Sequence, residues 1–261
     1  MRVGIGVSMA VLTAMLVQTV SAQQKFEPRS GQAGKDVVWV PTPQETVEMM
    51  LNMAKLTKED FHMDLGSGDG RTVITAAQRG ARSRGIEYNP DMVALSVANA
   101  KTAGVSERAE FVQADLFKTD FSMANVLTLF LLPDINLKLR PQILDMKPGT
   151  RVVSNTFMMG SGDDEWVPDE TQRVTEDCMS WCTAHLWIVP AKVNGKWTMG
   201  GQALTLNQKF QNVTGTMGSS PISNGKLNGS TITFTAGGTT YTGEVSADGK
   251  TIKGSNWSAT R

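Results

Sequence analysis

Residues 64–71 of this chain read Asp-Leu-Gly-Ser-Gly-Asp-Gly-Arg, and this octapeptide constrains the fold more than any other stretch. A largely apolar run at 61–63 precedes it, and a segment with helical character at 72–78 follows it. The pattern therefore predicts a strand, a glycine-rich loop and a helix in direct succession. In an open α/β sheet, such a unit brings backbone N–H groups and a helix N-terminus to a ligand at the carboxyl end of the first strand.

Three kinds of ligand-binding loop compete for this pattern. A dinucleotide loop has the spacing G-x-G-x-x-G, but in Gly66, Gly68 and Gly70 the third glycine comes one residue early. A P-loop ends in Gly-Lys-Ser or Gly-Lys-Thr, and this loop does not. Asp69 would oppose a pyrophosphate, whereas Asp64 and Asp69 favour the sulfonium and ammonium groups of S-adenosylmethionine (SAM). The loop therefore indicates SAM.

Two further acidic residues support this interpretation. Glu87 ends a strand-like run at 83–87, about twenty residues beyond Asp64, where a carboxylate can accept hydrogen bonds from ribose hydroxyls. Asp115 ends another strand-like run at 110–115, where it could meet the adenine amino group. The alternative is that Glu87 and Asp115 are helix caps or solvated turn residues.

The composition of the whole chain sets broad limits. Apolar residues make up 40% of the sequence and charged residues 19%, which is ordinary for a globular protein with a substantial core. The length of 261 residues allows one large domain, or a mid-sized domain with a smaller one. The 25 basic and 25 acidic residues cancel, so nothing suggests a surface for nucleic acid, and we expect no nucleic-acid partner.

Residues 1–22 have the features of a secretory signal peptide. Arg2 supplies a short positive region, residues 3–20 are apolar and uncharged, and the small residues Ser21 and Ala22 precede an expected cleavage site. After cleavage we expect no stable membrane span, and we expect an exported, periplasmic protein. The alternative is an uncleaved membrane anchor, because the apolar stretch is about long enough to cross a bilayer.

The two cysteines gain importance if the chain is exported. Cys178 and Cys182 lie four residues apart, and on a helix they would share one face with His185. Those three side chains could ligate a metal, but no fourth ligand is signalled nearby, and we predict no metal site. In an oxidising compartment a Cys178–Cys182 disulfide is the simpler outcome, and reduced buried thiols are the remaining alternative.

Residues 37–194 alternate between strand-like and helix-like segments, after a polar lead-in at 23–36 that we expect to be flexible. Near-continuous apolar strands between amphipathic helices predict an α/β fold, a parallel sheet covered by helices on both faces. The first helix is expected at 44–55, with Thr42 as its N-cap. The other expected segments are helices at 72–78, 91–102 and 134–145, and strands at 61–63, 83–87, 110–115, 126–132, 151–157 and 185–193.

The composition changes after Asn194. Residues 195–261 are rich in Gly, Thr, Ser and Asn, and short alternating runs are separated by the turn signals Asn224-Gly225, Asn228-Gly229 and Asp248-Gly249. We expect a small C-terminal antiparallel β domain, a meander or partial barrel. It is either a binding module or lid, or a packing element that covers an exposed surface.

Several segments in sequence order carry a family resemblance. These segments are Val40-Pro41-Thr42-Pro43, the octapeptide at 64–71, Gly85-Ile86-Glu87-Tyr88-Asn89-Pro90, Leu131-Leu132-Pro133 and Leu137-Lys138-Leu139-Arg140-Pro141. Over residues 37–193 the chain resembles the class I, seven-strand, Rossmann-like SAM-dependent methyltransferases. Within them it is similar to the protein-lysine methyltransferases of ATP synthase c-subunits and adenine nucleotide translocases, and to their bacterial relatives. It departs from the mitochondrial members in its signal peptide and its C-terminal β domain.

The resemblance implies a place for each matching residue. It places Asp64, Gly66, Ser67 and Gly68 at the methionine moiety, Glu87 at the ribose, and Asp115 and Leu116 at the adenine. Thr42 would lie near the methionine end. Leu132 and Pro133 would lie beside the transferred methyl group.

The predicted function is that of an enzyme, a SAM-dependent methyltransferase that acts on a nucleophilic acceptor, such as a protein lysine. Positioning supplies much of the catalysis of such an in-line displacement. The catalytic base is not identified, and Asp134, Tyr88 and His185 are the only proton acceptors we nominate. The alternatives are an exported, non-catalytic protein that binds SAM or another nucleoside, and an interaction protein that acts through its C-terminal β domain.

Overall fold

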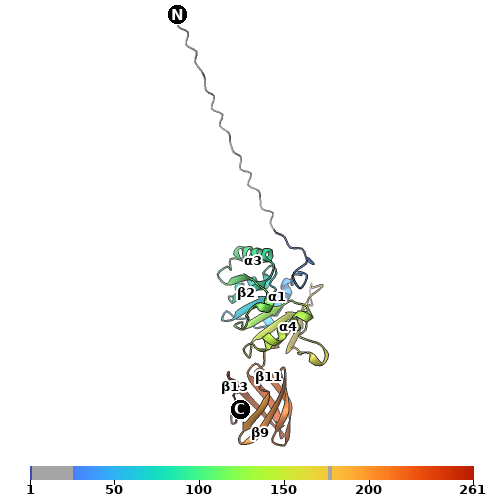
Figure 1. The fold of residues 1–261 in the computed structure, drawn as a ribbon, viewed down its shortest axis with the longest axis vertical. Helices are drawn as coiled ribbons and strands as arrows, with labels where there is room; N and C mark the ends of the chain where they lie inside the picture. The colour runs from blue at the N-terminus through green and yellow to red at the C-terminus, as the bar shows by residue number, and fades with distance from the viewer. Residues whose placement is uncertain (2–25, 176–177) are drawn as a thin grey trace.

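The computed structural model describes residues 1, 26–175 and 178–261. It contains a sheet domain with flanking helices and, below it in Figure 1, an all-β domain that holds the C-terminus. The predicted signal peptide at 1–22 lies, apart from Met1, outside the described residues. In the described part, no helix has the length and apolarity that crossing a membrane requires.

The sheet domain contains seven strands in the order β3-β2-β1-β4-β5-β7-β6. Its strands are β1 (Phe61–Leu65), β2 (Arg82–Glu87), β3 (Ala109–Gln113), β4 (Val126–Leu129), β5 (Arg151–Asn155), β6 (Glu170–Arg173) and β7 (Thr183–Ile188). The first five are parallel, whereas β7 runs antiparallel to both β5 and β6. The chain order reverses on either side of β1, which is where ligands bind in open α/β sheets. The predicted α/β fold is confirmed.

Four helices cover the sheet: α1 (Gln44–Met53), α2 (Arg71–Gln78), α3 (Pro90–Thr102) and α4 (Pro133–Leu144). Because side chains alternate along a strand, Met63 and Leu127 face one side, where they share a core with Ile135 and Leu139 of α4. Helices α1, α2 and α3 pack on the other side. There Met50 of α1 shares a buried cluster with residues of β4, β5 and β7.

Two local predictions were wrong, and one strand was not predicted. Thr42 does not cap α1, because Pro43 holds the N-cap position without a side-chain hydrogen bond. The strand β6 was missed, because all four of its residues are polar and exposed and give no alternating pattern. Asp115 lies beyond β3, which ends at Gln113, and its carboxylate accepts a hydrogen bond from Phe117 N (3.0 Å) at the start of a short 3-10 helix.

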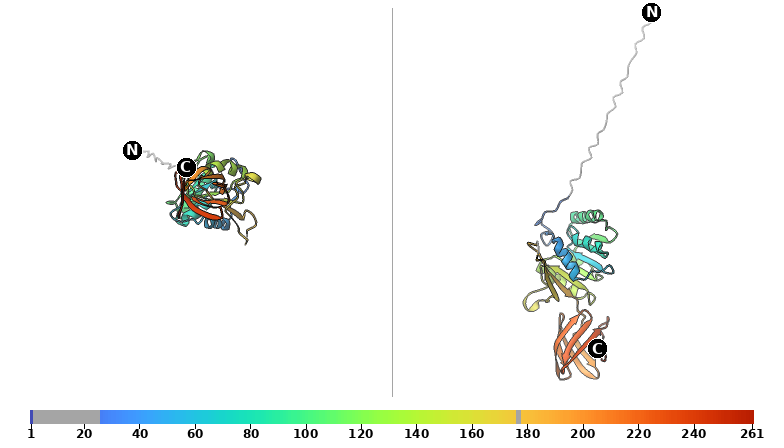
Figure 2. Two further views of the ribbon diagram at one scale, coloured as in Figure 1. Left: turned by 90° about the horizontal axis from the view of Figure 1, so that it is seen from below. Right: turned by 180° about the vertical axis from the view of Figure 1, so that it is seen from behind.

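The C-terminal domain is a closed antiparallel barrel of eight strands, seen end-on in Figure 2. Its strands are β8 (Gly195–Met199), β9 (Gln202–Lys209), β10 (Asn212–Met217), β11 (Ser220–Asn228), β12 (Thr231–Ala236), β13 (Thr239–Val245), β14 (Thr251–Gly254) and β15 (Ser258–Thr260). The predicted turn at Asn224-Gly225 was wrong. These residues lie inside β11, where the register shifts against both neighbouring strands, and Asn224 adopts a φ of 51°.

The barrel joins the sheet domain through one of its ends. Gln211 donates a hydrogen bond to Val167 O (2.7 Å), and Lys226 pairs with Asp169 at 3.4 Å. The barrel interior is apolar and buried. It includes Trp197, Leu204, Leu206, Ile232 and Phe234.

Candidate functional site

A cavity of about 210 Å³ opens at the carboxyl ends of the parallel strands. All eight residues expected to bind SAM line it. These are Thr42, Asp64, Gly66, Ser67, Gly68, Glu87, Asp115 and Leu116. Because they come from four separate segments of the chain, the fold gathers them as the strand-end argument requires. Their individual roles stay predictions.

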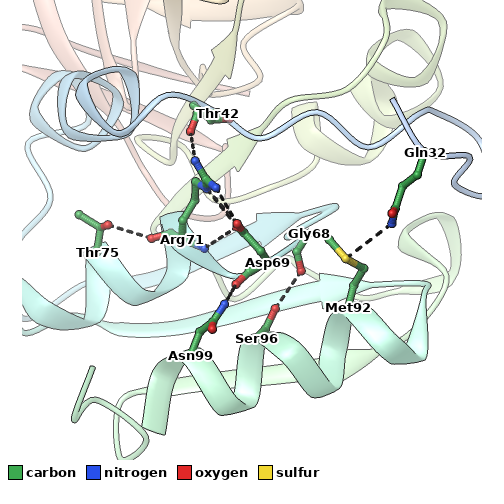
Figure 3. Close-up of polar contacts among 9 residues, drawn as sticks. All are labelled: Gln32, Thr42, Gly68, Asp69, Arg71, Thr75, Met92, Ser96 and Asn99. Atoms are coloured by element: carbon green, nitrogen blue, oxygen red, sulfur yellow. Dashed lines mark hydrogen bonds and ion pairs between the residues drawn. The ribbon is translucent and has the colours of Figure 1, made fainter. Parts of the chain in front are cut away.

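The glycine-rich loop has a backbone that explains its glycines. Gly66, Gly68 and Gly70 adopt φ values of 79°, 54° and 83°, in the left-handed region that glycine enters most easily. This path turns Gly68 N toward Glu87, whose Oε2 accepts its hydrogen bond at 3.0 Å. Ser96 of α3 donates to Gly68 O at 2.8 Å (Figure 3), so the loop is fixed from both sides.

Asp69 does not offer its charge to the cavity as the sequence led us to expect. Its carboxylate pairs with Arg71 at 2.6 Å, and Arg71 Nη1 also donates to Thr42 O at 2.9 Å (Figure 3). Asn99 donates to Asp69 O at 3.0 Å. Asp69 therefore anchors the loop and the segment before α1, and the negative charge available to a ligand comes mainly from Asp64 and Glu87.

Asp64 ends a chain of buried hydrogen bonds that crosses three neighbouring strands. Thr128 of β4 donates its hydroxyl to Asp64 Oδ1 at 2.6 Å. Since that donation uses its only proton, Thr128 Oγ1 must accept from His62 Nε2, which lies 2.9 Å away. His62 Nδ1 is then an acceptor for the Ser83 hydroxyl at 2.6 Å. Every donor in the chain points toward Asp64.

Burial changes the acidity of both titratable members of this chain. It raises the pKa of Asp64 to about 7, against the opposing hydrogen bond from Thr128 and with the help of the nearby charges of Glu87 and Asp69. Burial also lowers the pKa of His62 to about 3, so its ring is neutral at physiological pH. A perturbed carboxyl at the wall of a cavity is typical of a functional site.

Residues 32–39, ahead of Thr42, also form part of the cavity wall, which the sequence did not predict. Lys35 Nζ lies 2.9 Å from Asp115 Oδ2, and this hydrogen bond lowers the pKa of Asp115 and raises that of Lys35. Trp39 packs over the loop so closely that a Cβ on Gly68 would lie 2.6 Å from its Nε1. Gln32 contacts Met92 Sδ at 4.0 Å (Figure 3).

The other half of the cavity is aromatic. Phe130 follows β4, Phe157 follows β5 and Trp181 precedes β7, so three neighbouring strands each bring one ring to the same edge. The ring centroids lie 6.0 Å apart for Phe130 and Phe157, 5.4 Å for Phe130 and Trp181, and 5.9 Å for Phe157 and Trp181. All three rings line the cavity. The site is therefore acidic on the β1–β2 side and aromatic on the β4–β5–β7 side.

The residues nominated for catalysis separate into two groups. Tyr88 and Leu132 line the cavity and are 51% and 45% exposed. Pro133 and Asp134 begin α4 and are not among the lining residues. His185 also lies away from the cavity, because its Nε2 donates to Thr156 O at 3.2 Å and its Nδ1 accepts from the Thr171 hydroxyl at 2.9 Å.

The cavity fits a ligand with cationic and hydroxyl groups. Asp64 Oδ2 faces no hydrogen-bond donor in the described part of the chain, although its Oδ1 is bonded to Thr128. Ser67 Oγ is buried without a partner among the described residues, and it packs against Gly85, where a Cβ would lie 2.5 Å from it. A Cβ on Gly66 would lie 3.1 Å from Leu131, which leaves little room for any other residue at the loop.

Comparisons with known proteins agree with this chemistry. Residues 64–170 match the family model described as the ANTKMT methyltransferase domain. A protein-lysine N-methyltransferase of Saccharolobus islandicus is 38% identical over 156 residues, which are 59% of this chain and 94% of that protein. The ATP synthase C-subunit lysine N-methyltransferase of Mus musculus is 34% identical over 134 residues. That match covers 51% of this chain and about half (52%) of the mouse protein.

A solved structure is also similar. The crystal structure of an RNA methyltransferase from Salinibacter ruber in complex with S-adenosyl-L-homocysteine is 46% identical, with a TM-score of 0.54. The match covers 59% of this chain and 96% of that chain. The similarity thus extends over a length close to that of the sheet domain.

Proposed function

We propose that this chain, which belongs to the class I SAM-dependent methyltransferases, transfers the methyl group to the side-chain amine of lysine residues in proteins. Membership in the family rests on the Saccharolobus islandicus relative, 94% of which is matched at 38% identity. The acceptor is our proposal, and the division of the cavity into an acidic half and an aromatic half carries it.

The acidic half is the proposed donor site. Bound there, SAM supplies an electrophilic methyl group on a sulfonium. We assign Asp64, with Gly66, Ser67 and Gly68, to the methionine moiety, because its ammonium matches the Asp64 oxygen that faces no donor among the described residues. Glu87 follows at the end of the next strand and is assigned to the ribose hydroxyls.

The remaining assignments lie at the two sides of the donor site. Asp115 and Leu116 line the part of the cavity beyond Glu87, in line with an adenine contact. Thr42 contacts the loop anchor Arg71 through its carbonyl, so it supports the methionine end. Leu132 also lines the cavity, two residues after Phe130, and is the proposed neighbour of the methyl group.

The aromatic half favours a lysine over RNA as the acceptor. A lysine presents four methylene groups and an amine, and aromatic rings bind both the apolar stem and the cationic head. RNA binding requires phosphate contacts from a basic surface, whereas this chain has 25 basic and 25 acidic residues. The two basic side chains that line the cavity, Lys35 and Arg71, are already paired with Asp115 and Asp69, so they do not offer a free positive surface to phosphate.

The amine must lose its proton before it can act as a nucleophile. Partly buried rings exclude water from it, and desolvation disfavours the ammonium form. Among the residues nominated as proton acceptors, only Tyr88 lines the cavity. We therefore propose that the lysine first binds against the rings as the ammonium. The positive sulfonium of bound SAM and desolvation then lower the amine pKa, so that the amine releases its proton to solvent without a dedicated base.

A labelling experiment tests the acceptor. The purified protein is incubated with methyl-labelled SAM and cell-envelope extract, and the product is divided for protease and ribonuclease treatment. We expect the label to be released by protease, and to appear as Nε-methyllysine by mass spectrometry after acid hydrolysis. Label released by ribonuclease would replace lysine with RNA as the acceptor.

Calorimetry with SAM and S-adenosyl-L-homocysteine separates binding from transfer. We expect Asp64→Ala and Gly66→Val to abolish SAM binding, while the exposed control Met123→Ala binds normally. Tight binding by the unaltered protein without transfer to any extract would favour a non-catalytic SAM-binding protein. If the protein transfers no methyl group but binds envelope proteins through its barrel, it is an interaction protein.

We also propose that the protein is exported. The signal-like residues 1–22 motivate this proposal, and the Cys178–Cys182 disulfide supports it because such bonds persist in oxidising compartments. Periplasmic and cytosolic fractions should be compared for the mature protein, whose N-terminus would be Gln23. Recovery of the uncleaved chain in the cytosol would contradict export.

A further inference from the structure

The connection between β6 and β7 joins the disulfide to the aromatic half of the cavity. Cys178 and Cys182 are bonded, with their Cα atoms 5.9 Å apart, and Trp181 immediately precedes Cys182. The Trp181 ring lies 5.4 Å from Phe130 and 5.9 Å from Phe157. A covalent crosslink therefore lies directly beside one wall of the cavity.

The backbone at Trp181 has an unusual conformation that needs support from its surroundings. Its φ is 60°, in the left-handed region, which a bulky side chain rarely enters. Such residues persist only where neighbouring structure holds them. The disulfide provides one restraint, and Thr46 of α1 provides another by donating its hydroxyl to Trp181 O at 3.1 Å.

These two restraints act at different points of the same loop. Cys182 is 3% exposed and its carbonyl accepts from Val174 N at 2.8 Å, so this end belongs to the β6–β7 hairpin. Cys178 lies further out, and Met179 beside it is fully exposed. Without the crosslink, Cys178 would be joined to the hairpin only through the backbone, and the hydrogen bond from Thr46 would be the remaining side-chain restraint on the Trp181 backbone among the described residues.

The three rings form a surface suited to an alkylammonium group. Trp181 is 37% exposed, and Phe130 and Phe157 are partly buried, so all three rings are accessible from the cavity. The faces of aromatic rings attract cations, most strongly for tryptophan. The carboxylate of Asp64 lies on the other half of the same cavity, which keeps donor and acceptor contacts apart.

We propose that Phe130, Phe157 and Trp181 form the binding pocket for the acceptor's alkylammonium group, with the Cys178–Cys182 disulfide holding Trp181 in place as its third wall. The inference rests on the proposed function, because it assigns the acceptor side of the same site. The three aromatic residues contact the acceptor, and the two cysteines are positioning residues that act through Trp181.

A small probe tests the pocket without knowledge of the natural acceptor. Nα-acetyl-trimethyllysine amide is titrated into the protein saturated with S-adenosyl-L-homocysteine, and its binding is followed by NMR saturation transfer. The uncharged Nα-acetyl-norleucine amide is the matched control for hydrophobic binding. We expect the cationic probe to bind, and Trp181→Leu to weaken it roughly 3- to 30-fold, the range of a single cation–π contact. Trp181→Phe should restore part of that loss.

A double-mutant cycle tests the role of the disulfide. The paired change Cys178→Ser with Cys182→Ser should weaken probe binding about as much as Trp181→Leu, and should add little in the Trp181→Leu background. Reduction of the disulfide by dithiothreitol should weaken probe binding to the same extent. In that reaction the two thiols of dithiothreitol are oxidised to a cyclic disulfide, and each cysteine gains an electron and a proton. Thr46→Val should make the effect of reduction larger, because it removes the second restraint.

The affinity for SAM distinguishes a local effect from unfolding. Calorimetry should give an unchanged SAM affinity for Trp181→Leu and for the cysteine pair, because neither contacts the acidic half. Equal binding of the cationic probe by all variants would overturn the pocket. If the paired cysteine substitutions weaken probe binding as much in the Trp181→Leu background as in the unaltered protein, the positioning role is overturned. If the labelled methyl group is found on RNA while the cationic probe still binds as expected, lysine is not the acceptor, but the aromatic pocket for alkylammonium groups is retained.

Discussion

Thr128 and Asp64, on neighbouring strands β4 and β1, share a buried hydrogen bond of 2.6 Å in which the threonine hydroxyl is the donor. Neither residue is exposed by more than 7%, so water does not screen the contact. The bond stabilises the ionised carboxylate, while burial favours the neutral acid. Because its pKa is about 7, Asp64 is partly ionised at physiological pH, and a bound cation would favour its ionised form.

SAM affinity should depend on pH through Asp64. Its pKa is raised to about 7, so the carboxyl is neutral below that pH and ionised above it. A cationic ligand prefers the ionised form. The dissociation constant should therefore rise up to about tenfold for each pH unit below 7 and level off above it. Calorimetry between pH 5.5 and 7.5 checks this, and a flat profile would show that Asp64 does not meet the ammonium.

Thr128→Val should weaken SAM binding and move its pH profile upward. The change leaves Asp64 Oδ1 and the His62 N–H without partners, which costs about 1–3 kcal/mol for a buried polar group. It also removes the one contact that lowers the pKa of Asp64, so the carboxyl ionises at higher pH. Thr128→Ser keeps the hydroxyl and is the control. Identical profiles for the two variants would contradict the hydrogen-bond chain.

Asp64→Asn should stabilise the ligand-free protein at pH 8 but not at pH 4. The folded pKa is raised from 3.8 to about 7, so the folded state binds more protons than the unfolded state between these values. The contribution of Asp64 to stability thus falls as pH rises from about 4 to 7, by at most roughly 4 kcal/mol. Denaturant unfolding of both proteins at the two pH values measures the difference. An equal effect of the substitution at pH 4 and pH 8 would refute the raised pKa.

The acidic half of the cavity was readable from local sequence, whereas the aromatic half was not. Asp64 and Glu87 come at the ends of strand-like runs, and parallel strands place their carboxyl ends at one edge. Phe130, Phe157 and Trp181 are spread over 52 positions and meet only because β4, β5 and β7 are neighbours in the sheet. No local pattern carries that strand order, which depends on packing over the whole sheet.

Two other differences have local physical causes. The polar composition of residues 23–36 suggested a loose lead-in, but Gln32 and Lys35 contact the sheet domain through side-chain bonds that periodicity does not reveal. The pair Asn224-Gly225 predicts a hairpin turn because such turns favour residues with a left-handed φ. In the structure the left-handed φ of Asn224 instead accompanies a β-bulge. The barrel's existence followed from composition, and its closure did not.

Gly68→Ala should impair SAM binding, whereas a matched substitution at a glycine away from the cavity should not. An alanine at φ 54° costs about 1–2 kcal/mol, and its Cβ would lie 2.6 Å from Trp39 Nε1, so the indole must move into or away from the cavity. Gly104→Ala is a matched control, since Gly104 has a φ of 70° and a Cβ there would meet nothing within 4 Å. We expect both variants to lose similar stability in denaturant unfolding. Only Gly68→Ala should lose SAM affinity, by about tenfold or more, which corresponds to about 1.4 kcal/mol. Equal SAM affinities for the two variants would show that the contact between Trp39 and the loop does not shape the donor site.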